Sequence, residues 1–234
     1  LEGLAIAERA FQRAVAYARE RLQGKDLVEG GKTVPIIRHP DVRRMLMLMK
    51  SQTEAMRAVA YVVAAAMDFA HKTKDQKHQA FVDLMIPVVK GWSTETGMEV
   101  ASLGVQVHGG MGFIEETGAA QHLRDARITT IYEGTTGIQA NDLVGRKVGR
   151  EQGCTAFTLI DEMEKLAAEL PAPKNVHLPA IADRFSSAVA RLKEATQWIV
   201  ECHPTNPAAV AAGSVYYLKL MGITCGGWMM ARSA

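Results

Sequence analysis

Residues 106–147 read QVHGGMGFIEETGAAQHLRDARITTIYEGTTGIQANDLVGRK and contain the features that decide the fold and the candidate site. Residues 128–132 are mostly β-branched or aromatic, so we expect an extended segment there. Gly134, the next residue but one after this segment, gives the backbone conformational freedom. Thr135 is a favourable N-cap for a following helix. The stretch therefore places one carboxylate, that of Glu133, between an extended approach and the start of a helix.

Glu133 is the candidate catalytic base of the chain. A helix N-terminus favours the charged form of a nearby carboxylate, whereas burial in an apolar pocket disfavours it. The sequence leaves open which effect is larger, and together they would poise the group for proton abstraction. The alternative is structural: Glu133 caps a helix or pairs with Arg124 or Arg127.

Hydrophobic periodicity predicts an almost wholly helical chain, in the all-α class. Apolar residues recur at three- and four-residue steps over four long ranges: 4–23, 41–71, 77–107 and 135–150. Four such helices with short connections favour an antiparallel four-helix bundle. Residues 24–40 are expected to form a loop, and Pro87 is expected to kink the third helix or to mark a late start.

The apolar positions also predict which faces are buried. The first helix is expected to bury a stripe of five residues: Leu4, Phe11, Val15, Ala18 and Leu22. The second carries a Met-rich stripe that we interpret as core packing and not as a cofactor box: Met45, Met49, Met56 and Met67. The third helix is expected to stop at the glycines that follow residue 107.

A second region begins after Arg150. Helices are predicted over 154–170, over 178–202 and from Pro207 onward, separated by the breaks PAPKN and HPTNP. The chain is therefore divided into a bundle domain, 1–150, and an additional C-terminal helical domain, 151–234. Lys219 interrupts the apolar run of the last helix and leaves two halves too short for a bilayer. We interpret it as a buried bundle helix without stable membrane insertion, with membrane contact as the alternative.

Composition excludes several classes of function. The 234 residues are 48% hydrophobic, enough to bury a sizeable core, and the net charge is only +2. Basic residues are interleaved with acidic ones, which speaks against binding of nucleic acid. Cys154, Cys202 and Cys225 lie far apart, as expected of small buried hydrophobes in a reducing cytoplasm and not of disulfides or zinc ligands. No histidine pair has metal-binding spacing, so no metal is expected.

QVHGGMGF followed by LRDARITTIYEGTTGIQ resembles the paired signature of the acyl-CoA dehydrogenases, flavoprotein oxidoreductases of fatty acid metabolism. Both motifs stand in the family's order, with Glu133 at the position of the family's base. The resemblance implies FAD as cofactor and α,β-dehydrogenation of an acyl-CoA thioester. It also implies that the thioester oxygen accepts hydrogen bonds from the backbone N–H of Glu133 and from a flavin hydroxyl.

The resemblance implies a set of cofactor-binding residues. Arg21 would meet the FAD diphosphate from a neighbouring subunit, and Gln106, Gly109 and Gly110 would approach the adenosine end. The alternatives are a solvated arginine at a helix end and a plain helix stop.

Thr135 would lie near the adenine or diphosphate, a placement that is compatible with an N-cap. Gly137 occupies a cofactor-contacting position where many shorter members carry Gln, so that side-chain contact is in doubt. His39 and Pro40 likewise stand where shorter members have a Gln that touches flavin.

The resemblance further implies electron-transfer flavoprotein as electron acceptor and assembly into a homodimer or homotetramer. The helices beyond Arg150 and the glycine at 137 resemble the longer bacterial branch that includes the 3-methylmercaptopropionyl-CoA dehydrogenases. Both chain ends fall within helical patterns, so we expect a C-terminal fragment that is inactive alone. The alternatives are a catalytically idle helical assembly domain and an acyl-CoA oxidase.

Overall fold

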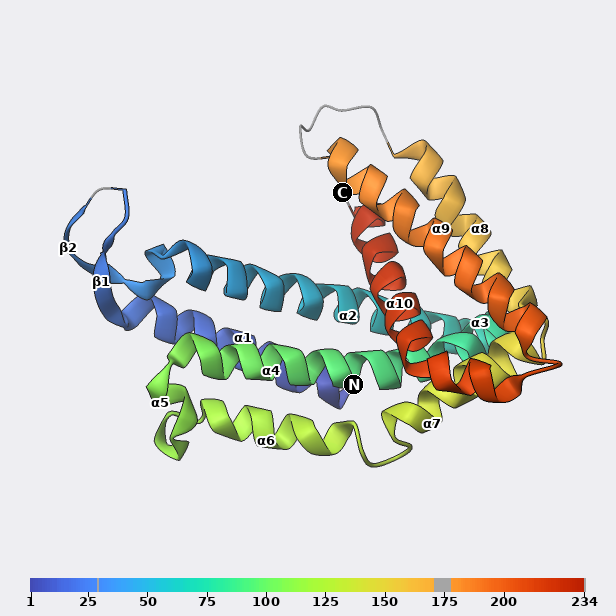
Figure 1. Ribbon diagram of the computed structural model, residues 1–234, viewed down its shortest axis with the longest axis horizontal. Helices are drawn as coiled ribbons and strands as arrows, with labels where there is room; N and C mark the ends of the chain where they lie inside the picture. The colour runs from blue at the N-terminus through green and yellow to red at the C-terminus, as the bar shows by residue number, and fades with distance from the viewer. Residues whose placement is uncertain (29, 171–177, 234) are drawn as a thin grey trace. The chain divides into compact units, whose positions relative to one another are not determined.

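The computed structural model describes residues 1–28, 30–170 and 178–233 (Figure 1). Its elements are α1 (Glu2–Glu20), β1 (Leu22–Asp26), β2 (Gly30–Pro35), η1 (Ile36–Arg38), α2 (Pro40–Thr73), α3 (Gln76–Pro87), η2 (Val88–Trp92), α4 (Ser93–His108), α5 (Gly110–Phe113), η3 (Glu115–Thr117), α6 (Ala119–Thr129), α7 (Thr136–Asn141), η4 (Asp142–Gly149), α8 (Cys154–Glu169), α9 (Leu178–Cys202) and α10 (Pro207–Ser233). They form two compact units. Unit 1 comprises Leu1–Glu54 and Ser93–Glu133, and unit 2 comprises Ala55–Trp92 and Gly134–Ala234.

Unit 1 is organised around close packing of α1 on α4. A Cβ added at Gly3 would lie 2.6 Å from the carbonyl oxygen of Ser93, and one at Gly97 would lie 2.7 Å from that of Gly3. Further along the same pair of helices, Gly104 faces Ala10. The two helices therefore run parallel, and their C-terminal ends lie at the same end of the unit.

The buried face of α1 is a stripe of alanines at three- and four-residue steps: Ala7, Ala10, Ala14 and Ala18. The predicted stripe is thus partly wrong, because Phe11 and Val15 are only half-buried and Leu22 is 57% exposed in β1. The close approach of α4 explains the difference, since only small side chains fit between the two backbones.

The predicted extended segment at 128–132 is also wrong, because Ile128 and Thr129 are the last residues of α6 and a turn follows. Ala126 of α6 packs in a buried cluster with Ala10 and Ala101. Packing of this face outweighs the β propensity of the residues at the helix end. The expected all-α architecture is confirmed. The four main helices of unit 1 are α1, the first part of α2, α4 and α6, and α6 packs against α1 and α4 (Figure 1).

Residues 24–40 were expected to form a loop, but most of the segment belongs to the antiparallel hairpin of β1 and β2. An ion pair of 3.0 Å between Arg38 and Asp26 ties it to the segment before α2. The His39 ring nitrogen Nε2 lies 2.6 Å from the carbonyl oxygen of Gln23. Most hairpin residues are exposed, so the sequence lacks the alternation that marks a half-buried strand.

Pro87 is accommodated by a π-helical turn. The helical run continues from α3 through the π-helix η2 into α4, and the wider turn fits a residue that has no N–H to donate. In unit 2, η2 packs against α10: a Cβ added at Gly222 would lie 2.1 Å from Cγ of Trp92, and one at Gly91 would lie 2.6 Å from Cδ2 of Leu218.

The three C-terminal helices begin and end close to the predicted residues, and α8 and α9 lie side by side (Figure 1). The core of unit 2 contains several fully buried large side chains: Leu143, Ile160, Met163, Leu192, Leu218 and Met221. The predicted break PAPKN lies outside the described residues. Among the described helices, α10 is long and apolar enough to cross a membrane, with a mean hydropathy of 1.3, but 44% of its apolar window is buried.

Two predictions of buried residues need correction. Cys225 is buried as expected, but Cys202 is only half-buried and Cys154 is exposed; none of the three forms a disulfide. In the Met-rich stripe of α2 three residues are buried and Met67 is exposed; the buried ones are Met45, Met49 and Met56.

Candidate functional site

Glu133 lies in the turn between α6 and α7, in an unusual backbone conformation. Its φ is 53°, and that of Gly134 is 91°, so two successive residues occupy the left-handed half of conformational space. Such a φ costs a non-glycine residue about 1–2 kcal/mol. Lys74 and Gln152 share the feature: Lys74 directly follows the end of α2, and Gln152 lies in the turn between η4 and α8. Glu133 likewise lies in a turn between two helices, and here the next residue is also left-handed.

The residues after Glu133 are fixed within unit 2. Lys90 of η2 donates a hydrogen bond of 2.6 Å from Nζ to the carbonyl oxygen of Gly134. Thr135 is the N-cap of α7, as predicted, and its Oγ1 accepts a 3.2 Å hydrogen bond from the N–H of Ile138. Lys90 was missed by the sequence analysis. Its only signal is that it is the single cation in the apolar run IPVVKGW.

The Glu133 side chain is exposed on this chain. The two arginines considered as alternative partners have other contacts. Arg124 lies 3.4 Å from Glu115, and Arg127 donates a 2.6 Å hydrogen bond to Oγ1 of Thr130. A carboxylate held in a constrained turn and open to the surroundings is suited to accept a proton from a molecule bound outside the chain.

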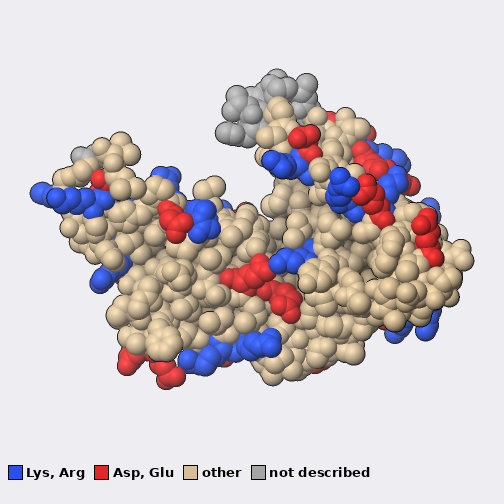
Figure 2. All heavy atoms as spheres, in the orientation of Figure 1, with Lys and Arg blue, Asp and Glu red and all other residues tan. Residues whose placement is uncertain are grey.

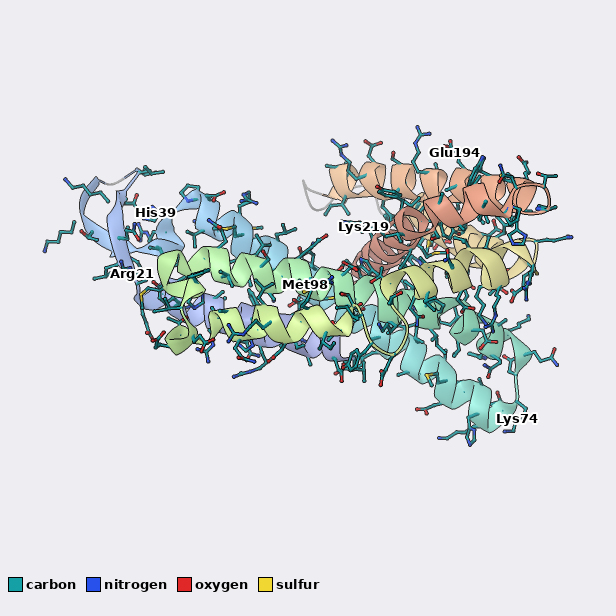
Figure 3. All side chains as sticks on the ribbon, turned by 60° about the horizontal axis from the view of Figure 1, so that its bottom comes forward. Arg21, His39, Lys74, Met98, Glu194 and Lys219 are labelled. Carbon is teal, nitrogen blue, oxygen red and sulfur yellow. The ribbon has the colours of Figure 1, made fainter. Side chains whose placement is uncertain are left out.

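Four predicted cofactor-binding residues lie at one end of unit 1, where α1 and α4 both terminate: Arg21, Gln106, Gly109 and Gly110. All four are exposed. A Cβ added at either glycine would meet no atom within 4 Å, so the space beside the backbone is open. The φ of Gly109 is 60°. Figure 3 shows Arg21 and His39 at the hairpin end of the unit. An exposed guanidinium near bare backbone fits the diphosphate of a dinucleotide.

Thr135 and Gly137 belong to unit 2, at the N-terminal end of α7. The hydroxyl oxygen of Thr135 accepts a hydrogen bond in the helix cap, so this residue acts as the N-cap that the sequence also allowed. A Cβ at Gly137 would meet only Oγ1 of Thr135, at 3.8 Å. The glycine therefore leaves open space at this position. In the family that the chain resembles, many shorter members are expected to fill it with a Gln side chain.

A hollow of about 500 Å³ lies beside the C-terminal end of α1, with Arg13, Tyr17 and His108 in its wall. The rings of Tyr17 and His108 stack with centroids 4.3 Å apart, and Nδ1 of His108 lies 2.7 Å from the carbonyl oxygen of Gly104. Burial lowers the pKa of His108 despite this hydrogen bond. Sequence reasoning missed Arg13 and Tyr17, which form long-range contacts within unit 1.

Figure 2 shows lysines and arginines interleaved with acidic residues over α8 and α9, not a continuous basic stripe. The described part of the chain contains no group of three His, Cys, Asp or Glu residues that could hold a metal ion.

Two family models match the chain. The model for the acyl-CoA dehydrogenase C-terminal domain matches residues 1–148, and the model described as acetyl-CoA dehydrogenase C-terminal like matches residues 159–234. A crystal structure of Caenorhabditis elegans ACDH-11 in complex with C11-CoA superposes with a TM-score of 0.78. The match covers 97% of this chain and 37% of that one, at 18% identity, and therefore supports the fold alone.

Curated relatives agree with these matches. The chain is 45% identical over its whole length to 3-methylmercaptopropionyl-CoA dehydrogenase of Ruegeria pomeroyi, which supports the expected resemblance to the longer bacterial branch. It is 32% identical over its whole length to a broad-specificity linear acyl-CoA dehydrogenase of Mycobacterium tuberculosis. The chain spans 40% of the length of each of these relatives. With the first family model covering more than half of its residues, the chain belongs to the acyl-CoA dehydrogenase family.

Proposed function

We propose that this chain is the C-terminal part of an FAD-dependent acyl-CoA dehydrogenase and that Glu133 is its catalytic base. The observation that carries the proposal is the left-handed backbone of Glu133, held at a position where a glycine would cost less. Strained backbone conformations cluster at active sites. Family membership and the names of the relatives give the reaction class.

In this proposal the Glu133 carboxylate removes a proton from the α-carbon of an acyl-CoA thioester. When bound, FAD accepts the hydride that leaves the β-carbon. The backbone N–H of Glu133 donates a hydrogen bond to the thioester oxygen and stabilises the enolate charge that develops there. Lys90 fixes the carbonyl of the next residue, which keeps the peptides on either side of Gly134 in one orientation.

The proposed cofactor contacts lie at the end of unit 1 where α1 and α4 terminate. Arg21 supplies a guanidinium for the diphosphate, and Gly109 and Gly110 allow close approach of the backbone. Electron-transfer flavoprotein as electron acceptor, a homodimer or homotetramer, and a cytoplasmic location stay predictions. So does the division into domains at residue 150, with the second family model beginning at residue 159. We expect the isolated chain to show no turnover and to bind FAD weakly or not at all.

The test is Glu133→Gln in the complete enzyme. Loss of a general base lowers turnover by about 10²–10⁴-fold, while the purified protein should stay yellow because bound FAD is retained. Glu194→Gln is the matched control, because Glu194 is an exposed carboxylate of α9 paired with Arg191 at 2.7 Å. Undiminished turnover in Glu133→Gln would rule out this residue as the base.

Two further measurements separate the alternatives. The flavin absorbance should bleach when a suitable acyl-CoA is added without oxygen, whereas an idle assembly domain would leave it unchanged. Stoichiometric hydrogen peroxide in air would identify an oxidase instead.

Gly134→Ala keeps the carboxylate but places a side chain at φ 91°, 2.7 Å from Nε2 of Gln139. It should lower the turnover number with little change in FAD content.

A further inference from the structure

The segment after α4 folds into a compact turn that carries both candidate glycines of the adenosine site. The N–H of Gly112 donates a 2.9 Å hydrogen bond to the carbonyl oxygen of Gly109. Oγ1 of Thr117 donates a 2.7 Å hydrogen bond to the carbonyl oxygen of Met111. A Cβ added at Gly112 would lie 2.3 Å from the carbonyl oxygen of Val105, so the turn lies directly on the end of α4. We call residues 109–118 the glycine turn.

Arg13 of α1 braces the far end of the glycine turn. Its Nη1 donates a hydrogen bond to the carbonyl oxygen of Thr117, a residue 104 positions away in the sequence. The guanidinium also lies against Gly118, where an added Cβ would meet Nη1 at 3.0 Å and Cζ at 3.1 Å. Gly118 has a φ of 72°, so a side chain there would be strained as well as crowded. The absence of a side chain at 118 thus makes room for the arginine.

Arg13, Tyr17 and Arg21 follow one another at steps of four residues, which places them along the same side of α1 and its C-terminal extension. Tyr17 stacks on His108, the last residue of α4, at 4.3 Å between ring centroids. The stripe that leads to Arg21 therefore contacts both the start and the end of the segment that carries Gly109 and Gly110. A shift of the glycine turn relative to α1 would break these contacts.

We propose that Arg13 is a positioning residue that holds the glycine turn at a fixed place relative to Arg21, so that both meet the diphosphate and adenosine of one FAD molecule. Arg13 itself does not touch the cofactor. This inference rests on the proposed function, because it assumes that Arg21 and the glycine turn contact FAD. A residue outside the signature motifs thus contributes to the affinity for the cofactor.

The chain offers a matched control. Arg9 lies one helical turn before Arg13, is also exposed and lines the same hollow. Its guanidinium donates a 2.8 Å hydrogen bond to Gln12 on its own helix, so it braces no other segment through that bond. Arg13→Met and Arg9→Met remove the same charge at neighbouring sites and keep an unbranched side chain that favours helix. Only the first removes the contact with Thr117.

The experiment compares these variants in the complete enzyme. Hydrogen exchange followed by mass spectrometry should show faster exchange of residues 109–118 in Arg13→Met, with the rest of unit 1 unchanged and with no effect in Arg9→Met. The dissociation constant for FAD, measured on the apoenzyme, should rise about tenfold, as expected for loss of a hydrogen bond from a charged donor. The turnover number at saturating FAD should stay unchanged. If Arg13→Met does not fold, Arg13→Lys, which keeps the charge, should show the same effects at several-fold smaller size.

Two outcomes would overturn the inference. Exchange of the glycine turn that is the same in the Arg13 and Arg9 variants would mean that Arg13 braces nothing. Faster exchange without weaker FAD binding would mean that the brace does not serve the cofactor. Neither outcome depends on Glu133, and an enzyme that is active after Glu133→Gln would contradict the proposed base without changing the exchange result. The two failures are therefore distinguishable.

Discussion

The contact of α1 with α4 predicts that one glycine-to-alanine change will destabilise the protein and another on the same helix will not. A Cβ at position 97 would lie 2.7 Å from the carbonyl oxygen of Gly3, whereas ordinary contact begins at 3.4 Å. The three nearest atoms all belong to the backbone of Gly3, so the helices themselves must move apart. Overpacking of this kind costs about 1–3 kcal/mol, against a gain in helix propensity of about 1 kcal/mol. We therefore expect Gly97→Ala to lose up to about 2 kcal/mol in net stability.

Gly104→Ala is the internal control. Its new Cβ would lie 3.6 Å from the Cβ and carbonyl oxygen of Ala10 and from Cε of Met49, all ordinary contacts. This variant should keep the gain in helix propensity and become more stable by up to about 1 kcal/mol. The two proteins should then differ in stability by the overpacking cost of about 1–3 kcal/mol, which corresponds to roughly 2–12 °C in Tm for a chain of this size.

Thermal unfolding followed by circular dichroism measures this difference, and hydrogen exchange of α1 and α4 locates it in unit 1. The predicted effect of the close approach would be contradicted if Gly97→Ala were as stable as Gly104→Ala, because the short distance would then carry no energetic consequence. Equal loss in both variants would also refute it, since the distances at the two positions differ by 0.9 Å, from 2.7 to 3.6 Å.

Two further predictions concern titration and thiol reactivity. Burial lowers the folded-state pKa of His108 and His122 below 6.5, so the unfolded chain binds more protons near that pH. The free energy of unfolding should therefore fall as the pH drops below about 7, and replacing both histidines with Gln should flatten this slope in denaturant titrations. Iodoacetamide should label the exposed Cys154 in the native protein, but Cys225 only after unfolding. Burial shields the Cys225 thiol and raises its pKa to about 12. Labelling of Cys225 in the native protein would contradict its buried position.

The sequence predicted the C-terminal helices well because glycine and proline mark their limits. The predicted ranges for α8 and α9 agree with the structure to within a residue, and α10 begins at Pro207 as expected. The segment at 128–132 was predicted wrongly because its local β propensity is opposed by packing of Ala126 on α1 and α4, which no local pattern reveals. The hairpin was missed for the opposite reason: its exposed strands lack any hydrophobic alternation.

The candidate site divides in the same way. Glu133 and the cap at Thr135 could be found from the sequence because they lie in one short stretch with distinctive residues. Lys90 and Arg13 could not, because their hydrogen bonds join residues 44 and 104 positions apart. The left-handed φ of Glu133 was equally invisible, since glutamate has no preference for that conformation. Residues that support a site from a distant segment become identifiable only once the fold is known.

The path of the chain between its two units limits how the protein can be divided. The backbone passes from one unit to the other after Glu54, after Trp92 and after Glu133, so neither unit is a continuous stretch of sequence. A single protease cut would not release either of them intact. Truncation at residue 150 would strip Trp92 of Gly222 and expose an apolar surface that promotes aggregation. Halves for complementation or for fusion to a reporter should therefore be designed around the spatial units and not around the linear order of the helices.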